Sequence, residues 1–336
     1  MRYGPPLVIS ALLVGLLGAG SSLIEGMETA ELQTLQDSLG IAPNVAHVTD
    51  AYLPVPETPG GAPDFILIQD VHRHPQVQSQ IASLILRGYS AWGVKKVFLE
   101  GAFTSLDLSI FHRVPTSTRA LLMARLVKDG NLSGPELAAV LIMEQEWRNP
   151  PVSPFQLFGM EDAKLYRQNV QAYEGVVARR DRALADVVSI RRLQTSMNLP
   201  EPNPLDEQLD RVEALLRLKL TSAEYEAYLQ SKDTVPSTPA LDPAVHAAEE
   251  FYRLAQLRSY AFLKEMYKKV PASTAPRILV VGGFHTAAMT ALLRQEGHSF
   301  VVLSPTVSSG EDAPIYEKRM QETADVLAEA LVPAPR

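Results

Sequence analysis

The chain has no cysteine among its 336 residues. Disulfide bonds, thiolate nucleophiles, iron–sulfur clusters and cysteine-based zinc sites are therefore excluded, and any bound metal would need His, Asp or Glu ligands. A basic tract is also lacking: 31 Lys and Arg stand against 38 Asp and Glu, a formal net charge of −7. Since a nucleic-acid surface needs clustered cations, we expect no nucleic-acid partner.

Long apolar runs are scarce, and the most conspicuous one lies near the amino terminus. Residues 7–17 read LVISALLVGLL, with Arg2 before them and the small residues 18–22 after them. This run is too short to span a bilayer comfortably, and its order is typical of a secretory signal. The sequence predicts a signal peptide at residues 1–22 and an exported protein, periplasmic or extracellular. The alternative is an uncleaved anchor, which would be the only membrane contact.

Five short apolar runs predict buried strands. They cover residues 65–68, 97–99, 155–158, 278–281 and 300–303, and most end in polar residues or glycine. Helical stretches lie between them, one of them beginning with a Ser133/Glu136 capping box. Strands alternating with helices predict an α/β fold with a mostly parallel sheet flanked by helices.

A long charged stretch interrupts this alternation. Residues 163–270 have helical patterning, contain a Thr221/Glu224 capping box and are divided by proline-containing loops. We interpret them as a helical arm inserted into the α/β domain, which would then comprise residues 64–162 and 271–336. Residues 23–63 would form an N-terminal extension with a short helix at 27–39, and a last amphipathic helix is expected at 316–331.

The candidate functional residues follow the predicted strands. Open parallel sheets bind ligands at the carboxyl ends of their strands, and this edge would gather histidines and carboxylates. His72, Glu100 and His285 are the candidate catalytic residues. Asp70, His74, Glu161 and Arg258 are candidate substrate-binding residues.

His285 follows a Gly282-Gly283 turn at the start of a predicted helix, where it could bind a metal, act as a general base or simply cap the helix. Glu100 ends an apolar strand, and a lone buried charge is costly, so it could bind a metal, act as a base, or pair with an arginine. His74 precedes Pro75, so a turn there would point it away from His72.

These residues lie in motifs that resemble the superfamily of erythromycin esterases, ChaN-like haem-binding lipoproteins and TraB/TIKI proteins. The matching pieces are IQDVH (68–72), FLEGA (98–102) and GGFHT (282–286), together with GMED (159–162). The first motif departs from the family, with Gln69 where glycine is usual and Asp70 where the esterases have glutamate. The whole set is most similar to uncharacterised exported bacterial proteins.

The resemblance implies different activities. TIKI-like members are metal-dependent proteases that use the His and Glu positions, erythromycin esterases hydrolyse a lactone with a His-activated water, and ChaN-like members bind haem. Members often carry an arginine on a helix before the last motif, which Arg258 would match. It could then orient a carboxylate or bind an anionic group.

Two functions remain open from the sequence, and the altered first motif leaves a third option, a scaffold that has lost its chemistry. The first is an exported hydrolase of an ester, lactone or peptide, in which His72, Glu100 and His285 activate water directly or hold Mn, Co, Zn or Fe. The second is a haem-binding or other ligand-binding envelope protein without catalysis, in which a histidine would be an axial ligand. The partner in either case is a small molecule or a peptide.

Overall fold

The computed structural model describes residues 27–54, 63–71, 74–197, 204–232, 236–270 and 275–307. The predicted signal peptide, the predicted helix at 316–331 and His72 all lie outside these residues. Within them, no helix is long and apolar enough to span a membrane.

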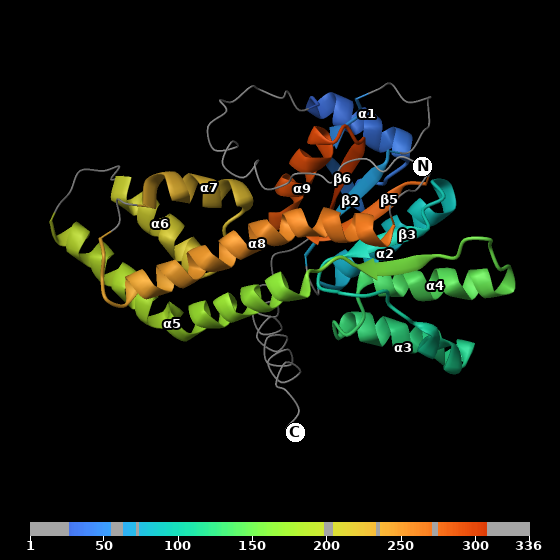
Figure 1. The fold of residues 1–336 in the computed structure, drawn as a ribbon, viewed down its shortest axis with the longest axis horizontal. Helices are drawn as coiled ribbons and strands as arrows, with labels where there is room; N and C mark the ends of the chain where they lie inside the picture. Colours follow the sequence, from blue (N-terminus) through green and yellow to red (C-terminus); the bar gives the residue numbers. More distant parts are fainter. Residues whose placement is uncertain are drawn as a thin grey trace, which may run out of the picture.

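A six-stranded sheet forms the centre of the α/β fold, which confirms the predicted fold class (Figure 1). Its strands lie in the order β1-β6-β2-β5-β3-β4. They are β1 (Ala46–Tyr52), β2 (Phe65–Asp70), β3 (Lys96–Leu99), β4 (Gln156–Gly159), β5 (Arg277–Gly282) and β6 (Phe300–Pro305). All neighbouring strands run parallel except β1, which pairs antiparallel with β6. The five predicted strands are β2 to β6.

Strand β1 was not predicted and lies within the expected N-terminal extension. Its burial alternates between the two faces of the strand, from buried Ala46 through exposed His47 to buried Val48. An edge strand of this kind lacks the continuous apolar run that marks the central strands. The expected extension therefore contributes a strand to the sheet, besides helix α1 (Thr29–Leu39).

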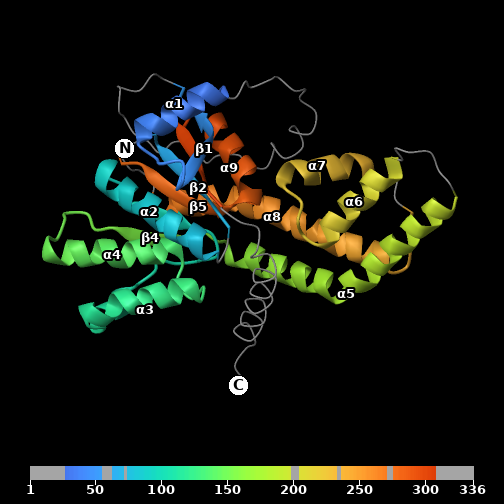
Figure 2. The same ribbon diagram turned by 180° about the vertical axis from the view of Figure 1, so that it is seen from behind.

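Helices cover both faces of the sheet (Figures 1 and 2). One face packs against α2 (Pro75–Ala91) and α4 (Gly134–Arg148), with α1 and α3 (Thr116–Lys128) contributing further apolar side chains. The other face packs against α9 (Gly283–Gln295) and the carboxyl-terminal half of α8 (Leu241–Lys269). A short 3-10 helix, η2 (Ser109–Arg113), precedes α3. The predicted Ser133/Glu136 capping box begins α4.

The stretch between β4 and β5 is helical in the described residues and extends away from the sheet (Figure 1). It contains α5 (Ala163–Ser196), α6 (Pro204–Leu216), α7 (Ser222–Ser231) and α8, and the predicted Thr221/Glu224 capping box begins α7. Its outer part has an apolar cluster of its own, whereas Phe262, Leu263 and Met266 of α8 belong to the cluster under the sheet. The inner ends of α5 and α8 are therefore placed to form one wall of a site at the strand ends.

Candidate functional site

The sheet order brings four predicted residues to one edge. Strands β2, β5, β3 and β4 are consecutive neighbours and parallel, so their carboxyl ends lie side by side. Asp70 ends β2, Glu100 follows β3, Glu161 follows β4, and His285 lies in the first turn of α9 after β5. A cavity of about 760 Å³ opens at this edge and is lined by Asp70, Glu100, Arg258 and His285, among others.

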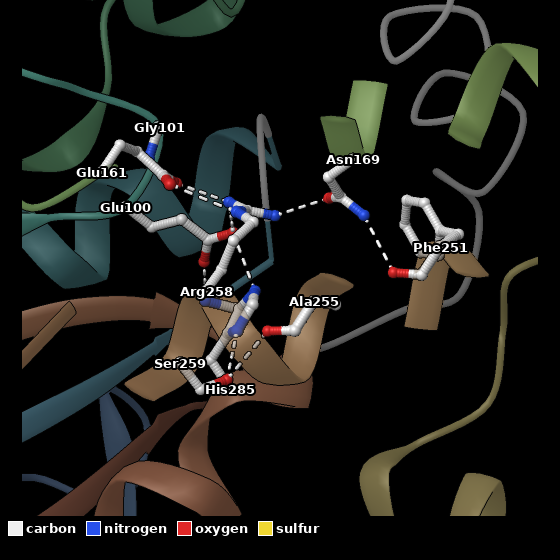
Figure 3. A network of polar contacts seen from close by, with 10 residues as sticks. Glu100, Gly101, Glu161, Asn169, Phe251, Ala255, Arg258, Ser259 and His285 are labelled. Carbon is white, nitrogen blue, oxygen red and sulfur yellow. Dashed lines mark hydrogen bonds and ion pairs between the residues drawn. The ribbon is translucent and has the colours of Figure 1, made fainter. Parts of the chain in front are cut away.

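Arg258 is the cation at the centre of the site (Figure 3). Its Nη2 donates to Glu100 Oε1 at 3.0 Å, and its Nε donates to Glu161 Oε2 at 3.2 Å. Its Nη1 donates to Asn169 Oδ1 at 2.9 Å. Only 6% of Arg258 is exposed, and the side chains of Glu100 and Glu161 are 10% and 0% exposed. Arg258 therefore neutralises part of the charge of two buried carboxylates.

Electrostatics keep this arginine charged. Burial by itself would lower the pKa of Arg258, but the Glu100 and Glu161 carboxylates outweigh burial and raise it. Backbone groups hold the carboxylates as well: Gly282 N–H donates to Glu100 Oε2 at 2.8 Å, and Gly101 N–H donates to Glu161 Oε1 at 3.0 Å. Gly101 has φ 78°, a conformation that glycine adopts without strain, so it can turn the chain sharply after Glu100.

His285 bonds to a carboxylate on one side and to a hydroxyl on the other. Its Nε2 lies 3.1 Å from Glu100 Oε1, and its Nδ1 lies 2.8 Å from Ser259 Oγ. A neutral imidazole that donates from Nε2 to Glu100 must accept at Nδ1, so Ser259 is then the donor. Ser259 Oγ also lies 3.1 Å from Ala255 O, the competing acceptor. Because Ser259 is 0% exposed, it can position His285 but cannot meet a ligand.

Aromatic side chains from α5, α8 and α9 form part of the lining of the cavity. They are Tyr166, Tyr173, Phe251, Tyr252 and Phe284. The Tyr166 ring lies 5.2 Å from the Arg258 guanidinium carbon, within the range of a cation–π contact. Burial raises the pKa of Tyr166, and Glu161 and Glu100 add to this while Arg258 opposes it. The Tyr166 phenol therefore stays protonated and able to donate a hydrogen bond at neutral pH.

The remaining predicted residues are placed as follows. His74 caps α2, accepting a hydrogen bond from Val77 N–H, and it is not among the residues lining the cavity. Asp70 accepts a hydrogen bond of 2.7 Å from Gln78. Gln69, at the position where the resembling families have glycine, donates to Thr286 in the GGFHT motif at 3.3 Å.

Three residues of the network were missed by the sequence analysis. Tyr166 and Asn169 lie on one face of α5, and Ser259 follows Arg258 on α8. Asn169 also donates to Phe251 O at 2.9 Å, which ties α5 to α8 behind the site. The spacing of Tyr166, Asn169 and Tyr173 at i, i+3 and i+7 was the available signal, but it equally describes an ordinary packed helix face.

The side chains that were predicted to bind a metal already form contacts within the protein. Glu100 and His285 are in direct contact, and both nitrogens of His285 have partners. Within the described ranges, which exclude His72, no group of three His, Asp or Glu side chains is placed to hold a metal. A haem iron would likewise need a nitrogen that His285 already uses. Glu100 and His285 could bind a metal or a haem iron only if their present contacts were broken. Metal and haem binding remain predictions.

Comparisons with known proteins give no family for this chain. No protein-family model matches it, and no curated protein matches it. Among solved structures, a crystal structure of a Bacillus cereus protein aligns over 82% of this chain and 68% of that chain, with 12% identity and a TM-score of 0.34. A likeness of that size carries no argument about fold or function.

Proposed function

We propose that the protein is a hydrolase that acts on an ester, lactone or peptide at the carboxyl ends of its strands. The observation that carries the proposal is the contact between Glu100 and His285 at the cavity, 3.1 Å long and shielded from solvent. A carboxylate and an imidazole in contact form an acid–base pair, and such pairs can move protons to and from a reacting group. No metal is needed for this chemistry.

In the proposed reaction a water molecule in the cavity attacks the carbonyl carbon and gives a proton to Glu100. The bond from carbon to the leaving oxygen or nitrogen then breaks, and the leaving atom takes that proton. Arg258 and His285 hold the Glu100 carboxylate in place throughout.

Two further features support the proposal. The first turn of α9 borders the cavity, and Gly282 at its N-cap leaves it without a side-chain cap. Backbone N–H groups at a helix start favour an anion, here the oxyanion that forms as water adds to a carbonyl. The Tyr166 phenol also borders the cavity and is a second donor for that oxygen.

A ligand-binding protein without catalysis is the second candidate. The five aromatic side chains on the cavity wall favour it, because pockets that bind organic ligands are mostly lined by apolar and aromatic groups. In that case the polar network would orient the ligand and bring about no reaction. The hydrolase would turn over a substrate and would need Glu100 to do so, whereas the ligand-binding protein would show no turnover.

The test is hydrolysis of p-nitrophenyl esters, dihydrocoumarin and a fluorogenic peptide library, with and without a chelator. We expect turnover by the parent and a loss of roughly 10²–10⁴-fold in kcat for Glu100→Gln and His285→Ala. His298→Ala is the matched control, because His298 precedes β6 at the opposite end of the sheet and is 35% exposed in its side chain. An inactive parent, or variants as active as the parent, would contradict the hydrolase proposal.

A further inference from the structure

The cavity at the strand ends has two chemically different sides. On the side of the sheet, its charged lining residues are Asp70, Glu100 and Glu136. The other side belongs to the helices from α5 to α8, residues 163–269, which we call the α5–α8 segment. Of the described lining residues that this segment supplies, only Arg258 is charged, and it is already paired with Glu100. The rest of this side is therefore uncharged.

Apolar and aromatic side chains make up most of this uncharged side. They are Val170, Tyr173, Leu218, Leu220, Phe251 and Tyr252. The Tyr252 hydroxyl accepts a hydrogen bond of 2.8 Å from Leu220 N–H, so it holds the backbone of the segment. Phe284 of α9 continues the apolar surface, because its ring centroid lies 5.3 Å from that of Tyr252 and 5.7 Å from that of His285. An apolar surface therefore begins directly beside the proposed reacting groups.

Leu218 is the residue of this surface with an unusual backbone. Its φ is 55°, and the other five described residues with positive φ are all glycines. Leu218 follows α6, and its N–H donates to Leu215 O at 3.0 Å. The next N–H, of Lys219, donates to Ala214 O at 2.9 Å. These two bonds form a Schellman motif, in which glycine usually takes the place of Leu218. A left-handed backbone brings the Cβ of a leucine too close to a carbonyl oxygen, so this residue is strained.

The side chain of Leu218 gives a reason for a strained leucine where glycine would fit. Leu218 lines the cavity and packs, partly buried, against the apolar cluster of the outer part of the α5–α8 segment. Glycine would relieve the strain but would remove apolar surface from the cavity lining. Strained backbone conformations gather at sites that bind ligands, where the position of the side chain matters for function. Strain and position together mark Leu218 as a residue that contacts a ligand.

We propose that the substrate carries a bulky, uncharged apolar group that binds on the surface from Phe284 to Leu218, and that Leu218 is a specificity-determining residue for it. The scissile carbonyl lies at Glu100 and His285, and the apolar group extends from it along the α5–α8 segment. A charged group on that surface would lose hydration without gaining a partner. The inference names the substrate class of the proposed hydrolase and rests on that proposal for the reaction, whereas the apolar subsite would also serve the ligand-binding candidate.

The test separates binding from turnover by using ketones, which a hydrolase cannot cleave. In benzylacetone and butanone, a methylene group replaces the leaving oxygen of benzyl acetate and methyl acetate. Their binding to the full-length protein is titrated by saturation-transfer difference NMR. We expect a Kd for benzylacetone at least about tenfold below that for butanone, because the phenyl ring leaves water for an apolar surface. A methyl ketone can bind in either direction, so the result does not depend on which side of the carbonyl carries the apolar group.

Three variants test the role of Leu218. Leu218→Ala and Leu218→Gly should each weaken the binding of benzylacetone at least about threefold, because methyl and methylene groups leave the apolar surface. Leu218→Gly should nevertheless have a higher Tm than Leu218→Ala, since only glycine relieves the strain. Leu229→Ala is the control, because Leu229 lies on α7, is 40% exposed and is not among the residues that line the cavity. It should leave the affinity for benzylacetone unchanged.

Equal affinity for the two ketones, or unchanged affinity for benzylacetone in both Leu218 variants, would overturn the inference. So would a loss of affinity in Leu229→Ala as large as that in Leu218→Gly. If either Leu218 variant fails to fold by circular dichroism, the other variant and the comparison of ketones in the parent decide.

Hydrolysis of benzyl acetate and methyl acetate, measured in parallel, tests the proposed function separately. A preference for benzylacetone without turnover of either ester would count against the hydrolase and leave the apolar subsite standing. Turnover of both esters without a preference between the ketones would support the hydrolase and overturn the inference about Leu218.

Discussion

Replacing Arg258 by methionine tests whether the polar network is built around this one cation. Methionine keeps the apolar stem but removes the charge and the bonds to Glu100, Glu161 and Asn169. Two carboxylates would then stay buried with no cation between them. Breaking a buried ion pair by removing one partner costs about 3–5 kcal/mol. For a chain of 336 residues, with an unfolding entropy of roughly 2.1 cal/mol/K per residue, this corresponds to a fall in Tm of roughly 4–7 °C.

The stability lost in the Arg258→Met variant should also depend on pH. Without Arg258, burial and mutual repulsion should raise the pKa of the two carboxyls above the value of roughly 4.3 that glutamate has in an unfolded chain. The folded variant then binds more protons than the unfolded variant, so its stability falls as pH rises through the raised pKa. The loss relative to the parent should be largest at pH 7 and smaller at pH 5.

The assay is urea unfolding followed by circular dichroism at both pH values. Arg253→Met is the control on the same helix, because Arg253 pairs with Glu250 in an exposed position and such pairs contribute at most about 1 kcal/mol. Adding Glu100→Gln and Glu161→Gln to the Arg258 variant should recover part of the lost stability. A loss below about 1 kcal/mol at pH 7, or a larger loss at pH 5, would refute the reasoning.

The remaining predictions concern other parts of the molecule. Ser259→Ala leaves Nδ1 of His285 without its partner and should cost about 1–3 kcal/mol in urea unfolding, while Ser79→Ala, on the exposed side of α2, should cost little. Burial is the main cause, and the negative charge of Glu249 the second, that raises the pKa of Tyr225 to about 12. The stability that this group contributes below its unfolded pKa of roughly 10 is therefore lost as pH rises through about 12, and Tyr225→Phe should flatten the alkaline limb of Tm against pH. We predict export with cleavage of the signal peptide, so mass spectrometry of the protein should find residues 1–22 missing, whereas an intact Met1 would favour the anchor.

Much of the candidate site could be predicted because it depends on where strands end. Apolar runs mark the central strands, and parallel strands with helical crossovers share a carboxyl edge. The positions of Glu100, Glu161 and His285 along the chain were therefore enough to predict that they lie near one another. Arg258 was a candidate only through the family resemblance, because no local pattern distinguishes a buried arginine from a solvated one on a helix.

Other features required the tertiary structure. Strand β1 went unnoticed because it is an edge strand with alternating burial, and its partner β6 lies about 250 residues later in the chain. The place of His74 at the N-cap of α2, before Pro75, also became visible only in the structure. Its role as a substrate-binding residue stays a prediction.

The sequence by itself determined the fold class and which side chains end the strands, since these follow from local apolar patterning and the geometry of a parallel sheet. Only the tertiary structure decided how those side chains are paired. Arg258 is 97 residues from Glu161, 89 from Asn169 and 158 from Glu100, so their contacts exist only once α5 and α8 pack across the strand ends. Because a buried charge is stable only beside its partners, that packing determines whether Glu100 is a structural or a reactive carboxylate.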